Sequence, residues 1–322
     1  MDGRAALTTE RRDRFVGWLD ALVPPGRIGI AVSGGPDSLA LLLLAEAARP
    51  GLVSAATVDH GLRRESADEA AMVAALCEAR DIPHAILRVT VADDPAGVQA
   101  AARKARYAAL GSWAIEQGIA WLATAHHADD QAETLLMRLA RGAGLGGLAG
   151  IRRSRPLAEA PGVTLIRPLL GWTKVELEQV VAAADLEPVR DPSNIDPRYD
   201  RTRARALLAG GWPDAERMAA AASHLAEAEE ALAWAAAELA EARIRFGADE
   251  ATLDASGLPR DLRRRLLLLL FARLAPGAEL RGDSLDRLLH ALDMGKVATL
   301  AGFRCAPGPL WRVSRAAARR RA

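Results

Sequence analysis

Five apolar, β-branched stretches alternate with helical patterns in the first two thirds of this chain, and this alternation limits the possible folds more than any other feature. The stretches read RIGIAVS, LVSAATVDH, PHAILRVTVA, IAWLATAH and TLIRPLL, and helical patterns follow them at about 37–49, 66–80, 97–117, 129–140 and 173–185. Apolar strands that alternate with helices predict a parallel sheet covered on both faces. We therefore expect an α/β domain with a doubly wound parallel sheet.

Three of these predicted strands end in polar clusters. The first, second and fourth strands run into SGGPDS, DHGLRR and AHHADD. The carboxyl ends of parallel strands meet at one edge of a sheet, where open α/β sheets bind their ligands. The sequence therefore predicts a single site built from these three clusters.

The pattern changes after Trp212 and Pro213. Residues 214–246 are rich in alanine and place an apolar residue at every seventh position from Met218 to Phe246. This spacing predicts a long helix that packs against a partner helix of the same chain. We expect two domains: a catalytic α/β domain at 1–212, and a smaller helical domain at 213–322 that ends in a basic tail.

Charge is distributed unevenly along the chain. The net charge is +1, but residues from Arg260 to the end contain 14 Arg and Lys against 5 Asp and Glu, so this quarter carries +9 and the remainder −8. Such a basic region favours contact with a polyanion such as RNA. The alternative is an arginine-rich surface that is merely solvated.

Composition also excludes several classes of protein. No apolar run approaches 18 residues, and the first residues are charged where a signal peptide would be apolar, so we expect a cytoplasmic protein without a membrane partner. The two cysteines, Cys77 and Cys305, are far apart and form no CxxC motif. This argues against a disulfide framework and against a cysteine-based zinc or iron–sulfur site, and it predicts two buried, inert thiols.

The turn SGGPDS after the first strand has the composition of a phosphate cradle. Gly34 and Gly35 permit close approach of a ligand, and the helix that follows presents unpaired N–H groups to an anion. Ser33 and Ser38 add hydroxyl donors, and Asp37 is a candidate Mg²⁺ ligand. The lysine of a Walker A loop is absent. The alternative is an ordinary strand-to-helix turn capped by a polar side chain.

This turn resembles a known signature. SGGxDS is the PP-loop of the N-type ATP pyrophosphatases, which cleave ATP to AMP and pyrophosphate. Other motifs follow in the order TVDHGLRRES, QAAARKARYAAL, ATAHHADDQAETLLMRLARGAGLGGLAGI, IRPLLGWTKVEL and DPSNIDPRYDRTRAR. Together they resemble the tRNA(Ile)-lysidine synthetase family over about 27–210, and more weakly beyond. The length is similar to that of the short form of the family.

The resemblance implies a reaction and its participants. A member of this family uses ATP and Mg²⁺ to adenylate the wobble cytidine of a tRNA(Ile) with a CAU anticodon. Free L-lysine then attacks the cytidine, which gives lysidine and AMP. The resemblance leaves both a monomer and a homodimer open.

The resemblance also implies roles for particular residues. We expect catalytic roles for Asp37, Asp130, Glu133 and Arg205, with Asp37 as the metal ligand and Asp130 and Glu133 as the lysine carboxylates. ATP binding is expected from Ser33, Gly34, Gly35, Pro36, Asp37, Ser38, Asp59 and His60. Contact with tRNA or substrate is expected from His127, Arg103, Arg106, Arg201, Arg203, Arg263 and Arg264. In a helix, Arg201 and Arg205 would share one face while Arg203 points elsewhere.

Three other functions compete with this interpretation. A PP-loop tRNA thiolase is disfavoured by the cysteine count. Synthesis of GMP or NAD is disfavoured by the basic C-terminal region and by the lack of a glutaminase-sized domain. An RNA-binding protein that binds nucleotide without catalysis would keep its function when Asp37 is replaced by alanine, whereas a ligase would lose it.

Overall fold

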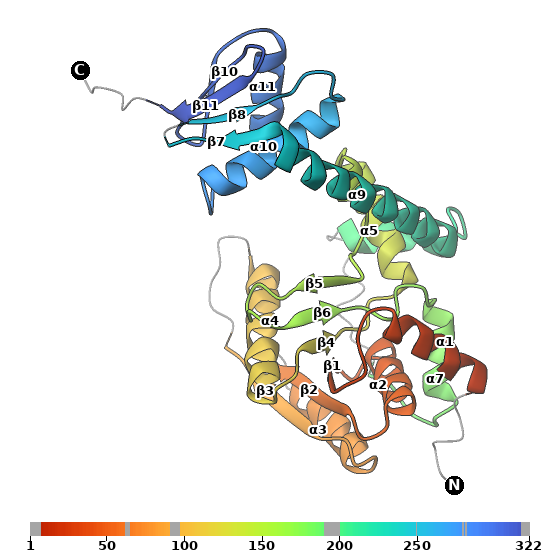
Figure 1. Cartoon of the computed structure of the whole chain (residues 1–322). Coiled ribbons are helices and arrows are strands. Elements are labelled where there is room, and N and C mark those ends of the chain that lie inside the picture. Colours follow the sequence, from red (N-terminus) through yellow and green to blue (C-terminus); the bar gives the residue numbers. More distant parts are fainter. Residues whose placement is uncertain are drawn as a thin grey trace. The chain divides into compact units, whose positions relative to one another are not determined.

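The structure is a computed structural model that describes residues 8–61, 65–90, 97–189, 200–248, 250–278, 280 and 282–316. The chain divides into two compact units, 1–226 and 227–322 (Figure 1). The division falls inside the long helix α9 (Ala215–Arg243), beyond the expected boundary at 212. The start of α9 belongs to the first unit, where Ala222 is buried close to Gly150.

A six-stranded sheet forms the centre of the first unit among the described residues. Its order is β3-β2-β1-β4-β6-β5, and β5 alone pairs antiparallel with its neighbour. The bounds are β1 (Ile28–Ala31), β2 (Val53–Asp59), β3 (His84–Arg88), β4 (Trp121–Ala123), β5 (Ser154–Pro156) and β6 (Thr164–Ile166). The five predicted strands and their parallel pairing are confirmed. The short edge strand β5 was not predicted, because three residues with two polar side chains give no apolar pattern.

Helices cover both faces of this sheet, and the five predicted helices in this region are confirmed with small shifts at their ends. The described helices are α1 (Thr9–Asp20), α2 (Pro36–Ala48), α3 (Glu65–Glu78), α4 (Val98–Glu116), α5 (Ala128–Ala140), α6 (Leu145–Leu148), α7 (Lys174–Ala182) and α8 (Asp200–Ala209). One hydrophobic core joins α1, α2, α3 and α7 to one face of the sheet. A second core joins α4 to the other face.

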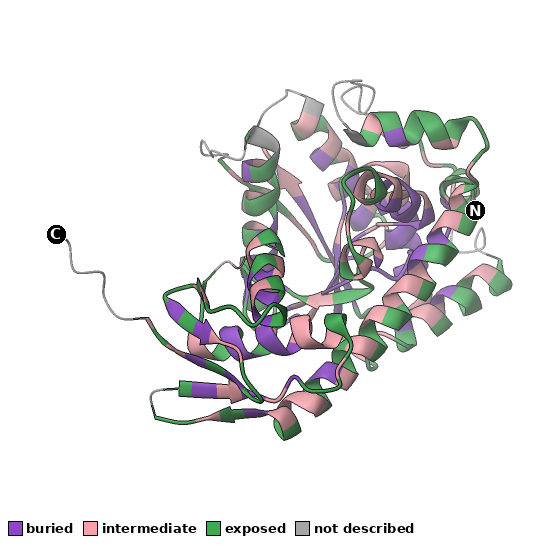
Figure 2. Cartoon of the chain, turned by 90° about the horizontal axis from the view of Figure 1, so that it is seen from above, coloured by how far each residue is buried: buried purple, intermediate pink, exposed green. Residues whose placement is uncertain are grey.

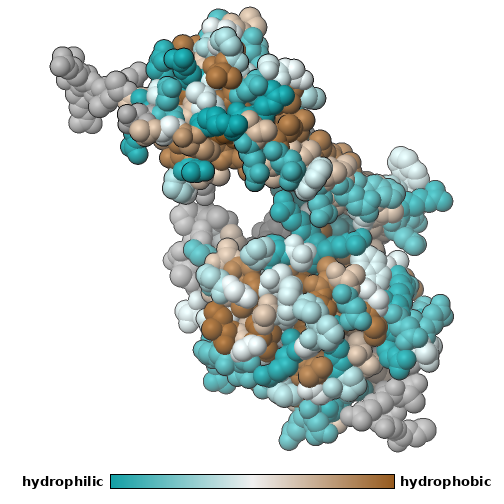
Figure 3. Space-filling view, viewed as in Figure 1, coloured by the Kyte–Doolittle hydropathy of each residue, from teal (hydrophilic) through white to brown (hydrophobic). Residues whose placement is uncertain are grey.

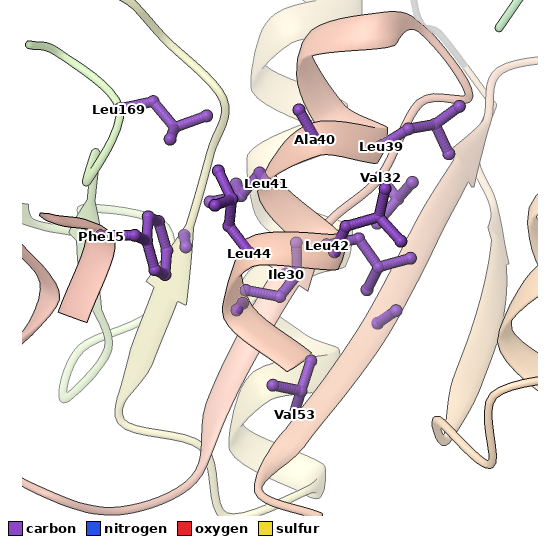
Figure 4. Close-up of a cluster of buried hydrophobic side chains, with 14 of the residues drawn as sticks. Phe15, Ile30, Val32, Leu39, Ala40, Leu41, Leu42, Leu44, Val53 and Leu169 are labelled. Atoms are coloured by element: carbon purple, nitrogen blue, oxygen red, sulfur yellow. The ribbon is translucent and has the colours of Figure 1, made fainter. Parts of the chain in front are cut away.

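The helix that follows the SGGPDS turn lies at the centre of the first core. Leu39, Leu41, Leu42 and Leu44 of α2 are fully buried, because this helix is apolar on all sides. Figure 4 shows these leucines packed against strand residues such as Ile30, with further side chains from outside α2 closing the cluster. The turn that starts α2 is therefore fixed to a rigid part of the core.

The strand order places a topological switch point between β1 and β4. From β1 the chain moves outward through β2 and β3, and it then returns to the other side of β1 to form β4 and β6. In open α/β sheets the crevice at the carboxyl ends of such strands is the usual ligand site. SGGPDS follows β1 and AHHADD follows β4, so both clusters lie at this point.

The second unit differs from the expected helical domain, because it also contains a sheet. Five antiparallel strands are paired in the order β7-β8-β11-β10-β9 in its described part. Their bounds are β7 (Ile244–Phe246), β8 (Glu250–Leu253), β9 (Ala298–Leu300), β10 (Phe303–Ala306) and β11 (Trp311–Arg315). Strands of three to five residues with alternating arginines give a weak pattern, so only α9, α10 (Arg260–Leu274) and α11 (Gly282–Asp293) were predicted.

Burial follows the layers of each unit. Figure 2 shows buried residues concentrated along the strands and on the inner faces of the helices. On the face shown in Figure 3, hydrophobic residues are interspersed with hydrophilic ones. Among the described helices, none combines the length and the apolar character that crossing a bilayer requires.

Candidate active site

The SGGPDS turn adopts the conformation of an anion-binding loop. Gly34 has φ of 81°, which a residue with a side chain rarely adopts, and its carbonyl accepts a hydrogen bond from the Val189 N–H at 3.1 Å. Gly35 is the N-cap of α2 and Pro36 is its first residue, so no side chain caps the helix. The first N–H groups of α2 are therefore left for a ligand.

The two serines of the loop have different roles. The Ser38 hydroxyl accepts from the Ser33 N–H at 3.0 Å and donates to the Gly35 carbonyl at 3.0 Å. Ser38 is buried and donates its hydroxyl proton to a carbonyl of the same loop, so it stabilises the conformation of the loop. Ser33 is exposed and its hydroxyl lies 3.2 Å from that of Ser38. Ser33 is thus the serine of the loop that is open to solvent.

Asp37 and His127 connect the loop after β1 to the cluster after β4. His127 Nε2 lies 3.5 Å from Asp37 Oδ2 and 3.6 Å from Asp130 Oδ2, and its Nδ1 lies 3.4 Å from Asp129 Oδ2. Burial disfavours the imidazolium, but hydrogen bonding to Asp129 and Asp37 outweighs it and raises the pKa of His127 to about 10. His127 is only 5% exposed, so this position favours a role beside the nucleotide over direct contact with RNA.

Asp129 and Asp130 are neighbours with separate roles. The Asp129 carboxylate accepts from the Lys174 N–H at 2.9 Å and thereby ties α5 to the start of α7. The Asp130 carboxylate accepts from the His127 N–H at 3.1 Å. Burial opposes ionisation of Asp130, but the charges of His127 and Arg201 more than compensate and lower its pKa. Asp130 is therefore a carboxylate at neutral pH.

Two arginines of α8 hold the carboxylates of α5. Arg201 Nε donates to Glu133 Oε2 at 2.6 Å and Arg205 Nε donates to Glu133 Oε1 at 2.8 Å. Arg201 Nη2 also pairs with Asp130. The prediction that Arg201 and Arg205 share a face of the helix is confirmed by this geometry, and Arg203 is exposed between them. Glu133 is 3% exposed, so its charge is compensated almost entirely by these guanidinium groups.

The cluster after β2 is arranged around its own loop. Asp59 accepts from the Gly61 N–H at 2.9 Å and from the Ser66 hydroxyl at 2.7 Å, and these bonds lower its pKa. Arg106 of α4 donates to His60 Nε2 at 3.4 Å, a long hydrogen bond. Burial and the positive charge of Arg106 lower the pKa of His60, so this imidazole is neutral at pH 7. Asp59 therefore shapes the loop that carries His60.

Sequence reasoning missed Arg167, and it gave His126, with His127, only a structural role beside the substrate or ATP. His126 Nδ1 lies 3.1 Å from the Thr124 hydroxyl. Burial and the nearby cations Arg167, Arg201 and Arg103 lower the pKa of His126 to about 4, against the opposing effect of Asp130. Arg167 follows β6 and is 3% exposed. The only sequence feature that could have pointed to Arg167 was its place in the motif IRPLL, directly after a strand. A single arginine at such a place does not indicate that its side chain is buried.

Comparison with known proteins identifies the family of this chain. Residues 9–210 match the family model of the PP-loop domain. A tRNA(Ile)-lysidine synthase from Novosphingobium aromaticivorans is 51% identical over 314 residues, which cover 94% of this chain and 93% of the relative. Another, from Zymomonas mobilis subsp. mobilis, is 46% identical over 92% of this chain and 91% of the relative. This chain belongs to the tRNA(Ile)-lysidine synthase family.

A solved structure supports the fold of this tRNA(Ile)-lysidine synthase family member. It is the U34-tRNA thiolase NcsA from Methanococcus maripaludis with its [4Fe-4S] cluster, which aligns with a TM-score of 0.54 and 19% identity over 68% of this chain and 78% of the thiolase. In this family member Cys77 and Cys305 are free thiols, each buried in a hydrophobic core. Burial raises the pKa of both to about 11, so the prediction of two buried thiols is confirmed and both stay protonated at pH 7.

In the second unit of this family member, the arginines predicted to contact tRNA have acidic partners. Arg263 pairs with Asp293, and Arg264 Nε lies 3.3 Å from Asp286 Oδ1. The guanidinium of Arg263 also lies 6.0 Å from the centre of the Trp311 ring. These contacts fix α10 to α11, and a phosphate would have to compete with the two aspartates.

Proposed function

We propose that this chain is an ATP-dependent ligase that joins free L-lysine to C2 of the wobble cytidine in a tRNA(Ile) with a CAU anticodon. The cytidine O2 first attacks the α-phosphorus of ATP, and pyrophosphate leaves. The ε-amine of lysine then attacks C2, the C2–O2 bond breaks, and AMP and a proton are released. The products are lysidine in the tRNA, AMP and pyrophosphate.

One observation supports this proposal more than any other. The side chain of His127 lies within 3.6 Å of both Asp37, in the loop after β1, and Asp130, at the start of α5. A pyrophosphate bound to the loop and an ammonium bound to the carboxylates would therefore share one site. Both steps of the reaction need this proximity, because the amine must attack the adenylated base before water hydrolyses it.

The loop fits a nucleotide with its metal ion. The Asp37 Oδ1 atom is buried and has no hydrogen-bond partner in the described part of the chain. A carboxylate oxygen left unpaired beside an anion-binding loop is the ligand that Mg²⁺ prefers. No three or more His, Cys, Asp or Glu side chains gather into a metal cage among the described residues, which suits an ion held mainly by ATP phosphates. When bound, Mg²⁺ would stabilise charge on the departing pyrophosphate.

The carboxylates of α5 differ in their access to lysine. The Asp130 side chain is 16% exposed, whereas that of Glu133 is 4% exposed and holds both Arg201 and Arg205. We assign the ammonium contact to Asp130, while Glu133 positions the two guanidinium groups. Arg205 and Arg201 then lie where they can stabilise negative charge on the α-phosphate. Arg103, Arg106 and the exposed Arg203 are assigned to the tRNA backbone.

A direct assay tests the proposal. The purified chain is incubated with ATP, Mg²⁺, labelled lysine and an unmodified tRNA(Ile) transcript with the CAU anticodon, and the label retained on RNA is counted. We expect retention that requires ATP and is lost with a wobble C-to-U transcript and with Asp37→Asn. AMP release without lysine retention would keep the ATP chemistry but overturn the assignment of lysine as the nucleophile.

A further inference from the structure

Arg167 is a buried cation that has no acidic partner among the described residues. It is 3% exposed, its Nη1 donates to the Arg152 carbonyl at 2.6 Å, and its Nε has no hydrogen-bond partner among the described residues. Arg49, the other buried arginine of the described residues, is satisfied in a different way. It donates to three backbone carbonyls and to Asp20. A buried polar atom without a partner requires an explanation, such as a ligand.

Two further arginines gather at the same place. The guanidinium carbons of Arg103, from α4, and Arg155, from β5, lie 4.9 and 5.4 Å from the centre of the Tyr107 ring. Tyr107 also neighbours Arg167. Burial lowers the pKa of Arg167, and the positive charges of Arg155 and Arg103 lower it further, against the opposing effect of Tyr107. None of the three arginines forms an ion pair with a carboxylate of the described residues. Three like charges around one ring repel one another unless an anion joins them.

The position of this cluster separates it from the PP-loop. Leu165 of β6 belongs to the core beneath α4, and Arg167 lies two residues further along, on the same face of the sheet. The helix α2, which carries the PP-loop, packs on the opposite face. Arg167 nevertheless lies near His126, because the carbonyl of the preceding Ile166 accepts a hydrogen bond from the Thr124 N–H at 3.0 Å, and the Thr124 hydroxyl lies 3.1 Å from His126 Nδ1. The cluster therefore adjoins the reaction centre without facing the pyrophosphate.

We propose that Arg103, Arg155 and Arg167 form a phosphate-binding pocket for the tRNA backbone next to the nucleotide that is modified. Guanidinium groups match the oxygens of a phosphodiester, and they can hold it from several directions. The Tyr107 ring keeps Arg103 and Arg155 in place, and the unpaired Nε of Arg167 supplies a buried donor. This inference rests on the proposed function, because it assumes that the second substrate is an RNA.

Binding experiments on the full chain test the pocket without requiring catalysis. The affinity for the tRNA(Ile) transcript is measured at several salt concentrations, and the affinity for ATP is measured without RNA. We expect Arg103→Gln and Arg155→Gln each to weaken tRNA binding and to reduce the salt slope by about 0.7–0.9. ATP affinity should not change. Lys104→Gln is the matched control, because Lys104 is exposed on the same helix and carries the same charge.

Arg167→Lys separates binding from structure. Lysine keeps the charge but loses the Nε–H and the planar fork. We expect weaker tRNA binding than in the wild type, with a thermal unfolding midpoint close to that of the wild type. If Arg167→Lys unfolds early, the exposed Arg103 still tests the pocket.

Two results would overturn the proposal. Loss of ATP affinity with unchanged tRNA affinity would assign the pocket to an ATP phosphate. Unchanged affinity for both ligands in all three variants would leave the cluster a packing feature. If lysine is not incorporated but RNA binding still depends on these arginines, the pocket stands and only the proposed reaction fails.

Discussion

Arg201 of α8 donates a hydrogen bond to Glu133 of α5 at 2.6 Å, although the two residues are 68 positions apart in the chain. Arg205 binds the other oxygen of the same carboxylate. These bonds hold α5, the helix that follows β4, against α8, which lies at the end of the PP-loop domain. The expected lysine site and the expected arginine motif are thus one structure.

Replacing Asp130 by asparagine should raise the KM for lysine by about tenfold or more, because a charge-assisted contact with the ammonium is lost. The KM for ATP should change little. Steady-state kinetics with each substrate varied in turn measure both values. Glu116→Gln, an exposed carboxylate on α4, is the control. An unchanged lysine KM in Asp130→Asn would show that Asp130 does not contact the ammonium group.

The two glycines of the loop should respond differently to alanine. Gly34→Ala forces a side chain into φ of 81° and should cost about 1–2 kcal/mol of unfolding free energy. Gly35 has φ of −74°, and a Cβ there meets only the Ser33 hydroxyl oxygen, at 3.7 Å. Gly35→Ala should therefore fold normally yet weaken ATP binding, because the methyl group occupies ligand space. Urea denaturation and ATP titration distinguish the two, and equal ATP affinity in Gly35→Ala and wild type would contradict the phosphate cradle.

The α10 arginines should contact tRNA only in competition with their aspartates. If they bind RNA, the double variant Arg263→Gln, Arg264→Gln should lower the salt slope of tRNA binding by the amount expected for the loss of up to about two phosphate contacts. Asp286→Asn should then strengthen binding, because it frees Arg264 from its partner. A filter-binding or fluorescence titration measures both effects. If neither variant alters affinity, these ion pairs serve only to join α10 to α11.

His126 should contribute to loss of stability in acid. Its pKa is lowered from 6.5 to about 4 in the folded chain, chiefly by burial, so the unfolded chain binds more protons between these values. The free energy of unfolding is therefore not reduced by His126 above pH 6.5, and it falls as the pH drops from 6.5 towards 4. His126→Gln should flatten this part of the pH profile in urea denaturation. His224→Gln, at an exposed position on α9, should leave the profile unchanged. Identical profiles for both variants would exclude His126 as the source.

Sequence patterns by themselves determined the parallel sheet and the PP-loop. Apolar strands and the glycines of SGGPDS act through local backbone preferences and burial, which are visible along the chain. The shared face of Arg201 and Arg205 was also predictable, because helical periodicity fixes it. The roles assigned to the catalytic, ATP-binding and tRNA-binding residues remain predictions.

Only the tertiary structure decided which of these groups meet. The sequence cannot reveal that His127 joins Asp37 to Asp130, or that two arginines compensate Glu133. Nor can it reveal that Arg167 is buried with no carboxylate partner among the described residues. The antiparallel sheet of the second unit was missed for the same reason, because its short strands gain their stability from pairing with distant segments. Contacts and desolvation between remote residues depend on packing in three dimensions, and local sequence patterns carry little information about them.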